Sequence, residues 1–256
     1  MPRFFSVRKM LEICTGSLAD CLAAEKGGAK RVELNSALAL GGLTPSLATL
    51  QAVKKVTDLK VQCMVRVRPA GFCYDKMEKD LMFAEAKQLL ENGADGIVFG
   101  FLREDCTIHQ AWTKEMADFI HGYGKEAIFH RAFDQCVDPV KAMQVCIDCG
   151  IDRVLTSGQQ AKAIDGLACL KNLQAQFGQA IQILVGSGVN AKNAEYIMQE
   201  TGITNLHSSC KGVKSDPTTV SNAVSFAVTE GNQYDRVDSQ VVADLVHCFK
   251  QLNMDL

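Results

Sequence analysis

Short apolar runs alternate with longer amphipathic stretches along the whole chain. The apolar runs have the length of strands and occupy residues 10–14, 30–34, 60–67, 95–99, 125–131, 152–156, 181–185 and 203–207. The amphipathic stretches are typical of helices and cover residues 18–26, 46–56, 75–91, 113–121, 139–150, 161–176, 190–200 and 238–251. Ser17 and Asp138-Pro139 are typical helix starts, and Gly27-Gly28 is a typical helix end. The pattern therefore predicts eight strand–helix units.

Eight such units favour a closed parallel (β/α)8 barrel, the TIM barrel fold. A doubly wound open sheet is the alternative, but the first turn, Cys14-Thr15-Gly16-Ser17, lacks the G-x-G-x-x-G pattern that often accompanies that fold. No domain boundary is visible, so we expect residues 1–256 to form a single domain. A long irregular segment, residues 210–236, separates the last predicted strand from the last helix, and such a length is typical of a lid, a binding loop or a mobile linker.

Composition excludes several classes of function. The 256 residues are 47% apolar and 22% charged, which is typical of a globular protein with a large core. A net charge of −2 gives no basic field for nucleic acid, and no apolar run reaches the roughly 18 residues of a membrane span. The stretch from Met1 to Met10 has no apolar core of signal-peptide length. We therefore expect a cytoplasmic protein with neither nucleic acid nor membrane as a partner.

Polar residues end several of the predicted strands, most densely in the segment from Phe129 to Asp134. His130, Arg131 and Asp134 there follow an apolar run, where buried polar groups cost stability unless they meet a partner or a ligand. A structural Arg131–Asp134 pair beside a satisfied histidine is the plain alternative. In a barrel the carboxyl ends of the strands form the mouth of the active site. We expect the strand-end residues to meet there, namely Glu12, Cys14, Glu33, Arg66, Arg68, His130, Arg131, Asp134, Thr156, Ser157, Gly186, Ser187, Gly188, His207, Ser208 and Ser209.

Two of these strand ends are suited to an anion. Gly186-Ser187-Gly188 follows the seventh strand and Ser208-Ser209 follows the eighth, and these loops often hold a phosphate in barrels. Arg66 and Arg131 would neutralise the anion through paired hydrogen bonds. The predicted anion-binding residues are therefore Arg66, Arg131, Gly186, Gly188, Ser208 and Ser209.

The same strand ends carry groups for acid–base chemistry. Glu33 or Glu12 would act as the base, and His130 or His207 as the acid or electrophile. The arginines would orient the substrate and stabilise charge. The predicted catalytic set is Glu12, Glu33, Arg66, His130, Arg131, Asp134 and His207.

Eleven cysteines, an odd number, are scattered along the chain, so we expect reduced thiols. Cys146 and Cys149 have C-x-x-C spacing but no second pair to complete a zinc site. Cys14 differs because it ends a predicted strand beside Glu12. Loop cysteines, namely Cys73, Cys136 and Cys210, could come close to it, and Cu(I) needs only two or three thiolates. Covalent catalysis by Cys14 with one of the histidines is a further alternative.

Several motifs together resemble the CutC copper homeostasis family over about residues 10–211. They are Met10-Leu-Glu-Ile-Cys14, Ala29-Lys-Arg-Val-Glu-Leu34, Gly41-Gly-Leu-Thr-Pro-Ser46, Arg66-Val-Arg-Pro69, Phe72-Cys-Tyr74, Phe129-His-Arg-Ala-Phe-Asp134, Arg153-Val-Leu-Thr-Ser-Gly158 and His207-Ser-Ser209. The resemblance implies a cytoplasmic (β/α)8 barrel, often self-associated, and linked by the family's name to copper. It also implies Cu(I) binding through cysteines, with Cys14 as one ligand and Asn35 at the position where the family frequently has a second cysteine. The family has no firmly attached reaction.

Two hypotheses of different classes follow. The first is a copper-handling protein that binds Cu(I) near the barrel mouth, weakly because Asn35 is a poor ligand. The second is an enzyme that uses acid–base chemistry on a small anionic or phosphorylated metabolite. The number of charged and hydrogen-bonding residues at the strand ends favours the enzyme, because Cu(I) binding does not need them.

Overall fold

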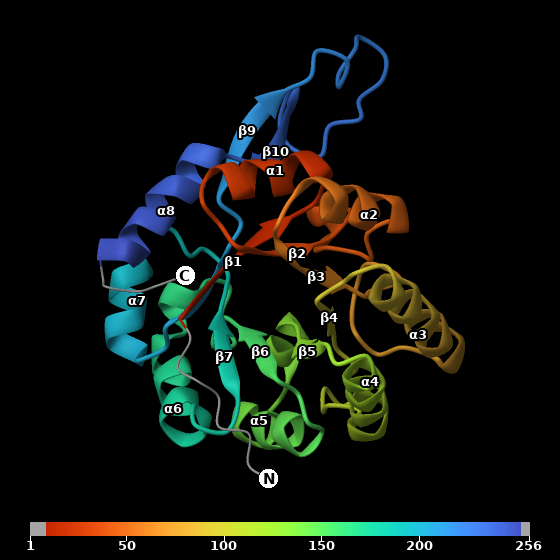
Figure 1. Cartoon of the computed structure of the whole chain (residues 1–256), viewed down its shortest axis with the longest axis vertical. Coiled ribbons are helices and arrows are strands. Elements are labelled where there is room, and N and C mark those ends of the chain that lie inside the picture. Colours follow the sequence, from red (N-terminus) through yellow and green to blue (C-terminus); the bar gives the residue numbers. More distant parts are fainter. Residues whose placement is uncertain (1–8, 252–256) are drawn as a thin grey trace.

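The computed structural model describes residues 9–251 as a closed barrel of eight parallel strands in chain order, surrounded by a ring of helices (Figure 1). The barrel strands are β1 (Met10–Thr15), β2 (Arg31–Leu34), β3 (Lys60–Met64), β4 (Gly96–Phe99), β5 (Glu126–Phe129), β6 (Arg153–Thr156), β7 (Gln182–Val185) and β8 (Asn205–Ser208). The helices are α1 (Leu18–Lys26), α2 (Leu47–Val56), α3 (Lys76–Glu91), α4 (Gln110–Gly122), α5 (Pro139–Asp148), α6 (Leu167–Phe177), α7 (Ala194–Thr201) and α8 (Ser239–Gln251). The predicted TIM barrel is therefore confirmed.

Local sequence explains where the helices begin. The Ser17 hydroxyl accepts a hydrogen bond from the Asp20 N–H at the start of α1. Asp75 and Glu78 form a reciprocal capping box at the start of α3. None of the helices within residues 9–251 is long and apolar enough to cross a membrane.

Some elements are shorter than the sequence predicts. The third strand ends at Met64, because the N–H of Arg66 donates to the Thr44 hydroxyl instead of a neighbouring strand. The fifth ends at Phe129, and Arg131–Gln135 forms a 3-10 helix, η2. These early ends place Arg66 and His130 in the loops at the barrel mouth.

The segment between β8 and α8 contains a regular part that its sequence does not show. β9 (Lys211–Ser215) and β10 (Gln233–Val237) pair antiparallel and form a ribbon that projects beside α1 (Figure 1). Most of their residues are exposed or half-buried, so neither strand needs the alternating apolar pattern that reveals a core strand. The remaining residues of the segment are irregular, as expected.

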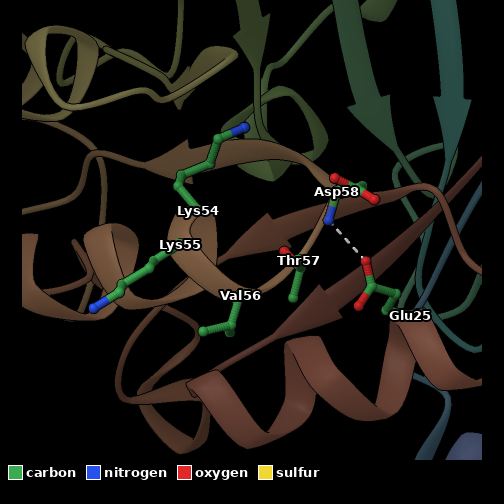
Figure 2. A pocket seen from close by; sticks show the side chains of 6 residues that line it. All are labelled: Glu25, Lys54, Lys55, Val56, Thr57 and Asp58. Atoms are coloured by element: carbon green, nitrogen blue, oxygen red, sulfur yellow. Dashed lines mark hydrogen bonds between the residues drawn. The ribbon is translucent and has the colours of Figure 1, made fainter.

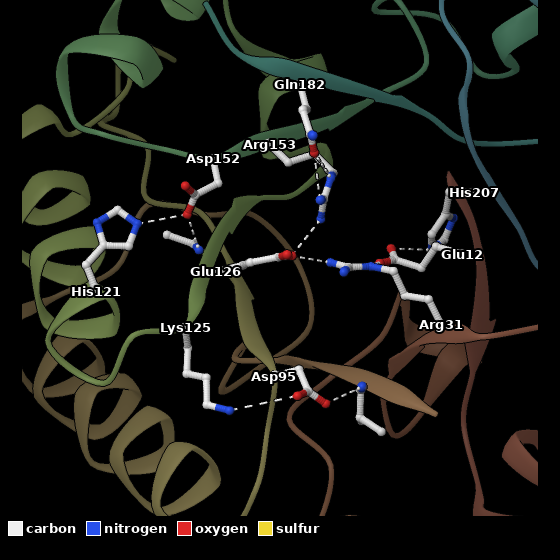
Figure 3. A network of polar contacts seen from close by, with 12 residues as sticks. Glu12, Arg31, Asp95, His121, Lys125, Glu126, Asp152, Arg153, Gln182 and His207 are labelled. Carbon is white, nitrogen blue, oxygen red and sulfur yellow. Dashed lines mark hydrogen bonds and ion pairs between the residues drawn. The ribbon is translucent and has the colours of Figure 1, made fainter. Parts of the chain in front are cut away.

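Alternating side chains along each strand divide the barrel into two environments. Leu11 and Ile13 belong to the main apolar core under the helices, whereas Glu12 between them points into the barrel, where its carboxylate meets Arg31 (Figure 3). Met64, Val98 and Ile128 form a separate apolar cluster of their own on neighbouring strands. Many other side chains that point into the barrel are polar, and these side chains form the candidate site.

Candidate functional site

The C-terminal ends of β1, β2 and β8 bring a thiol, a carboxylate and an imidazole together. Cys14 Sγ lies 3.6 Å from Glu33 Oε2, and His207 Nε2 lies 3.3 Å from the same oxygen. Strand register explains the meeting, because β1 pairs with β2 on one side and with β8 on the other. One ligand atom from each residue lies within 4.8 Å of the other two, and this is the only group of its kind within residues 9–251. The three residues could therefore hold a metal ion.

Asn35, which directly follows β2, holds the Glu33 carboxylate in place. It is buried, and its Nδ2 donates to Glu33 Oε2 at 3.0 Å and lies 3.6 Å from Cys14 Sγ. A Cβ on Gly42 would lie 2.5 Å from Asn35 Oδ1, so the glycine allows the amide to sit there. Asn35 thus positions the carboxylate, a role that nothing in the sequence pattern indicates.

Glu33 and His207 form an ion pair beside a neutral thiol. Burial would raise the pKa of Glu33, but hydrogen bonding and charge from His207 and the amide of Asn35 lower it. Burial would lower the pKa of His207, but its contacts with Cys14 and Glu33 raise it well above the usual value. Burial raises the pKa of Cys14 above its ordinary value, so the thiol is protonated at neutral pH.

His130 is a buried, neutral hydrogen-bond donor just after β5. Its Nδ1 accepts the N–H of Ala132 at 3.1 Å, which requires the ring proton to be on Nε2. Burial and the charge of Arg66 lower the pKa of His130 to about 4. Its Nε2 has no hydrogen-bond partner within residues 9–251. A Cβ on Gly100 would lie 2.6 Å from His130 Cε1, so only glycine leaves room for the ring.

Arg66 is a buried cation held by backbone carbonyls. NH1 donates to the carbonyls of Leu40 and Gly42 at 3.1 and 2.9 Å, and NH2 donates to that of Ala70 at 2.6 Å. The guanidinium lies 5.2 Å from the ring centroid of Phe72, whose ring packs on His130. No carboxylate within residues 9–251 pairs with Arg66, so its positive charge is not neutralised there.

Five polar atoms at this end of the barrel are buried and have no hydrogen bond of good geometry within residues 9–251: Glu33 Oε1, Arg66 Nε, Tyr74 OH, His130 Nε2 and His207 Nε2. Each such atom costs about 1–3 kcal/mol when it stays unpaired. Electrostatic contacts link these groups, because the charges of both Arg66 and Glu33 act on the pKa of His130. The Arg66 guanidinium also lies beside the Tyr74 hydroxyl, where its charge and hydrogen bonding oppose the rise that burial causes in the pKa of Tyr74. A cluster of unpaired atoms of this kind indicates a site for water or a ligand.

Glu12 lies deeper than the mouth, in a buried network that crosses the barrel (Figure 3). Arg31 Nε lies 2.7 Å from Glu12 Oε2, and Arg31 NH2 lies 2.5 Å from Glu126 Oε2. Arg153 also contacts Glu126, at 3.1 Å, and donates to Gln182. The Glu12 carboxylate is thus paired with Arg31. At the mouth it contacts His207, whose Nε2 lies 3.9 Å from Glu12 Oε1. The sequence did not point to Arg31, Glu126 or Arg153.

Arg131 and Asp134 join η2 to the loop after β6. Arg131 Nε lies 2.8 Å from Asp134 Oδ2, and its NH2 donates to the Ser157 hydroxyl at 2.9 Å. Asp134 also accepts from the Thr156 hydroxyl at 2.5 Å and from the N–H of Gln159. Nε and NH2 of Arg131 and both oxygens of Asp134 are therefore used within the protein.

The serines after β7 and β8 also bind the backbone. The Ser187 hydroxyl donates to the carbonyl of Ala161, and the Ser208 hydroxyl donates to that of Val189, both at 2.6 Å. Ser187 and Gly188 have positive φ of 79° and 74°. Ser209 is exposed. Gly186 and Gly188 flank Ser187, but the N–H of Gly186 donates to the Thr156 carbonyl at 3.0 Å and is not available to an anion.

Two cavities lie at the surface, at opposite ends of the barrel. One of about 390 Å³ is lined by Glu25 and by residues 54–58 at the end of α2 (Figure 2). It lies at the N-terminal end of the strands, away from the cluster. The other, of about 520 Å³, is lined by Phe72, Arg68, Arg103 and Gln135 among others. Phe72 therefore separates this second cavity from His130.

Comparison with known proteins decides the family. The family model for CutC matches residues 9–212. This chain belongs to the CutC family. A CutC family protein of Treponema denticola is 44% identical over 212 residues, covering 83% of this chain and 85% of the relative. One of Bacteroides thetaiotaomicron is 39% identical over 220 residues, covering 85% and 88%.

Solved structures agree with the fold. The crystal structure of CutC from Streptococcus agalactiae, described as a copper homeostasis protein, has a TM-score of 0.74 at 29% identity and covers 78% of this chain and 98% of that one. Phosphoribosyl anthranilate isomerase of Thermotoga maritima has a TM-score of 0.57 at 9% identity, covers 95% and 99%, and shows the shared fold alone. The description as a copper homeostasis protein belongs to the Streptococcus protein, and the barrel fold alone carries no reaction.

The remaining cysteines do not extend the Cys14 group of this CutC chain. Cys73 is exposed, whereas Cys136 and Cys210 are buried and contact the Ala132 carbonyl and the Ser208 hydroxyl. Cys146 is fully buried in α5, and Cys149, at the end of that helix, contacts a backbone carbonyl. Within residues 9–251, Cys14 is thus the one thiol in a group able to hold a metal.

Proposed function

We propose that this CutC family chain is an enzyme that performs acid–base chemistry on a small anion at the barrel mouth. The observation that carries the proposal is the pair of buried, unpartnered atoms on Glu33 and His130, together with the Arg66 cation that no carboxylate within residues 9–251 neutralises. If the barrel only needed to be stable, pairing these atoms or replacing them with apolar groups would raise its free energy of unfolding. A ligand that supplied their partners would recover that free energy on binding.

The environments of the charged groups suggest separate roles for them. Glu33 is ionised and has one free carboxylate oxygen, which suits a base that accepts a substrate proton. The neutral His130 presents Nε2–H, which suits hydrogen bonding to an oxygen where negative charge develops. Arg66 would bind the anionic group of the substrate, a role that we assign to Arg66 rather than to Arg131, because Arg131 already pairs with Asp134.

Ligand-dependent melting tests this function. Carboxylates, phosphate and sugar phosphates at millimolar concentration should include ligands that raise the melting temperature, because binding to the folded state stabilises it. His130→Asn keeps an acceptor for the Ala132 N–H but lacks the Nε2 donor, so it should lose the shift. Arg131→Gln is the matched control on the next residue and should retain the shift. If no compound in the panel moves the wild-type melting temperature, the enzyme proposal fails.

Copper binding is a second candidate, favoured by the Cys14–Glu33–His207 group. Thiolate sulfur and imidazole nitrogen suit Cu(I), whereas the carboxylate is a harder ligand. Binding would require Cys14 to lose its proton, which burial opposes, and His207 to leave its ion pair. We therefore expect weak Cu(I) binding that strengthens as the pH rises.

Competition with a Cu(I) chelator tests the second candidate. Cys14→Ser should lose most of the copper that the wild type takes up. The Cys146→Ser, Cys149→Ser double variant is the control and should retain it, because those thiols lie outside the group. Equal uptake by Cys14→Ser and the wild type would reject this site.

The family resemblance also implies a cytoplasmic, self-associated protein, and the composition predicts that it binds neither nucleic acid nor membrane; these expectations stay proposals. Light scattering of the purified chain would measure its mass in solution. A mass of about one chain at micromolar concentration would reject self-association.

A further inference from the structure

The tip of the β9–β10 ribbon is folded but exposes its apolar side chains. The N–H of Ser221 donates to the Val224 carbonyl, and the N–H of Phe226 donates to the Thr219 carbonyl, both at 2.9 Å. Phe226 is nonetheless 79% exposed, and the other large apolar side chains of the tip are exposed as well, namely Val220, Val224 and Val228. A two-stranded ribbon by itself is only marginally stable in water. An ordered tip with its apolar side chains in water therefore indicates a surface that packs against another surface.

The charges of the ribbon restrict what can cover its tip. Residues 216–232 contain two acidic residues, Asp216 and Glu230, and no lysine or arginine. Two tips facing each other would bring like charges together, which opposes a tip-to-tip contact. β9 carries Lys211 and Lys214, and lysines on an edge strand oppose its pairing with a strand of another copy. The tip is therefore suited to an apolar surface that offers an unpaired cation.

The same chain has such a surface at the cavity of about 520 Å³. Phe72 and Leu102 give its lining an apolar part, and Arg68, Arg103 and Glu104 are its charged residues. Arg68 pairs with Glu78, whereas the exposed Arg103 guanidinium makes no hydrogen bond or ion pair within residues 9–251. The cavity thus combines an apolar wall with an available cation.

The start of α3 extends this apolar surface. The loop that lines the cavity leads directly into α3, which begins three residues after Cys73. Met77 and Leu81 lie one turn apart on the same face of α3, and Met77 is 78% exposed. The cavity and this face of α3 together offer more apolar surface than the cavity alone.

Within one chain, the tip and this surface lie apart. The ribbon projects past α1, and α2 lies between α1 and α3 in the ring of helices (Figure 1). The residues that line the cavity all lie between positions 68 and 135, whereas the ribbon begins at Lys211. Two matching surfaces that are separated within one copy can meet between two copies.

We propose that two copies of this chain exchange their ribbons, so that the tip of each copy packs on the cavity and the start of α3 of the other. Phe226 occupies the cavity beside Phe72, and the acidic residues of the tip face Arg103. Because the pair is symmetric, the contact forms twice and buries twice the area of one tip, which favours a stable dimer. Each cavity is then incomplete without a side chain of the other copy.

The exchange also links assembly to the barrel mouth. The ring of Phe72 lies 4.8 Å from the ring of His130, so a tip that packs on Phe72 would hold this ring in place beside the mouth. The tip lies beyond residues 9–212, which the family model matches, so the contact is specific to this chain. The inference does not depend on the reaction proposed above.

Sedimentation velocity of the intact chain at micromolar concentration tests the contact. The wild type should have twice the 27.9 kDa mass of one chain. Phe226→Asp and Met77→Asp should each weaken the dimer at least about tenfold, because each places a charge where an apolar side chain is buried between copies. Tyr196→Asp on α7 is the matched control and should stay dimeric. All three side chains are more than half exposed, so these substitutions should leave the barrel folded.

Mixing the two weakened variants distinguishes the exchange from other dimers. In a mixed pair, the intact tip of Met77→Asp meets the intact surface of Phe226→Asp, so one of the two contacts forms. The mixture should therefore associate more strongly than either variant alone. A wild type with the mass of one chain, a dimer that Met77→Asp leaves unchanged, or a mixture that associates no better than the separate variants would each overturn the proposal.

Discussion

Replacing Arg31 by methionine should strongly destabilise the barrel. The Arg31 side chain is 8% exposed and lies between Glu12, which is 2% exposed, and Glu126, which is 40% exposed (Figure 3). Methionine has a similar length and fills the same space without the charge. The variant therefore leaves the Glu12 carboxylate buried, with His207 at 3.9 Å as its one remaining ion-pair partner within residues 9–251.

The two broken contacts differ in cost because they differ in exposure. Removing one partner from a buried ion pair costs about 3–5 kcal/mol, and this applies to Glu12. The contact with the more exposed Glu126 contributes only about 0–1 kcal/mol, because water screens it. The Glu12 contribution dominates, so we expect a loss of about 3–5 kcal/mol in the free energy of unfolding. At roughly 2 °C per kcal/mol for a chain of this length, the melting temperature should fall by about 6–10 °C.

A matched double variant separates the charge from the packing. Arg31→Met with Glu12→Leu removes both charges, so no carboxylate stays buried and most of the stability should return. Denaturant unfolding and calorimetry of the wild type, the single and the double variant measure the difference. The reasoning is refuted if the single variant loses less than about 1 kcal/mol, or if the double variant is as unstable as the single one.

Three further predictions follow from other contacts. Burial would raise the pKa of Glu126, but the charges of two arginines lower it to about 2 from the unfolded 4.5. The contribution of Glu126 to the free energy of unfolding should therefore be present above about pH 5 and lost as the pH falls to 2. In Glu126→Gln, the free energy of unfolding should change less with pH over this range. Gly100→Ala should abolish ligand-dependent melting shifts, because the added Cβ would meet His130 at 2.6 Å; unchanged shifts would contradict this. A thiol reagent should modify the exposed Cys73 first. The buried Cys63 should stay unreacted until the protein unfolds, because burial raises the pKa of its thiol far above the usual value. Mass spectrometry of peptides measures the order of modification.

The fold could be predicted because each strand and helix carries its own local signal. The ribbon of β9 and β10 could not, because its exposed residues pack on no core and need no apolar alternation. The Arg31–Glu126 contact was also hidden, since its partners are 95 positions apart and lie at the starts of strands, where charged residues usually face solvent. Only closure of the barrel places them in its interior.

The candidate site was partly visible for a related reason. Glu33, Arg66, His130 and His207 end strands that converge, so their type and position placed them at one mouth. The neighbours His130 and Arg131 show the limit of this reasoning, because one step along the chain turns a side chain from the buried cluster to the pair with Asp134. The sequence contains both residues but not the direction in which each points.

The two proposed functions share Glu33 and need different protonation states of the groups around it. Binding of a small anion uses the Glu33–His207 pair as it stands, with the Cys14 thiol protonated. Binding of Cu(I) requires the thiol of Cys14 and the ring of His207 to release protons and so breaks that pair. Raising the pH should therefore favour the metal and disfavour the anion. A ligand that bound equally well at low and at high pH would use neither arrangement.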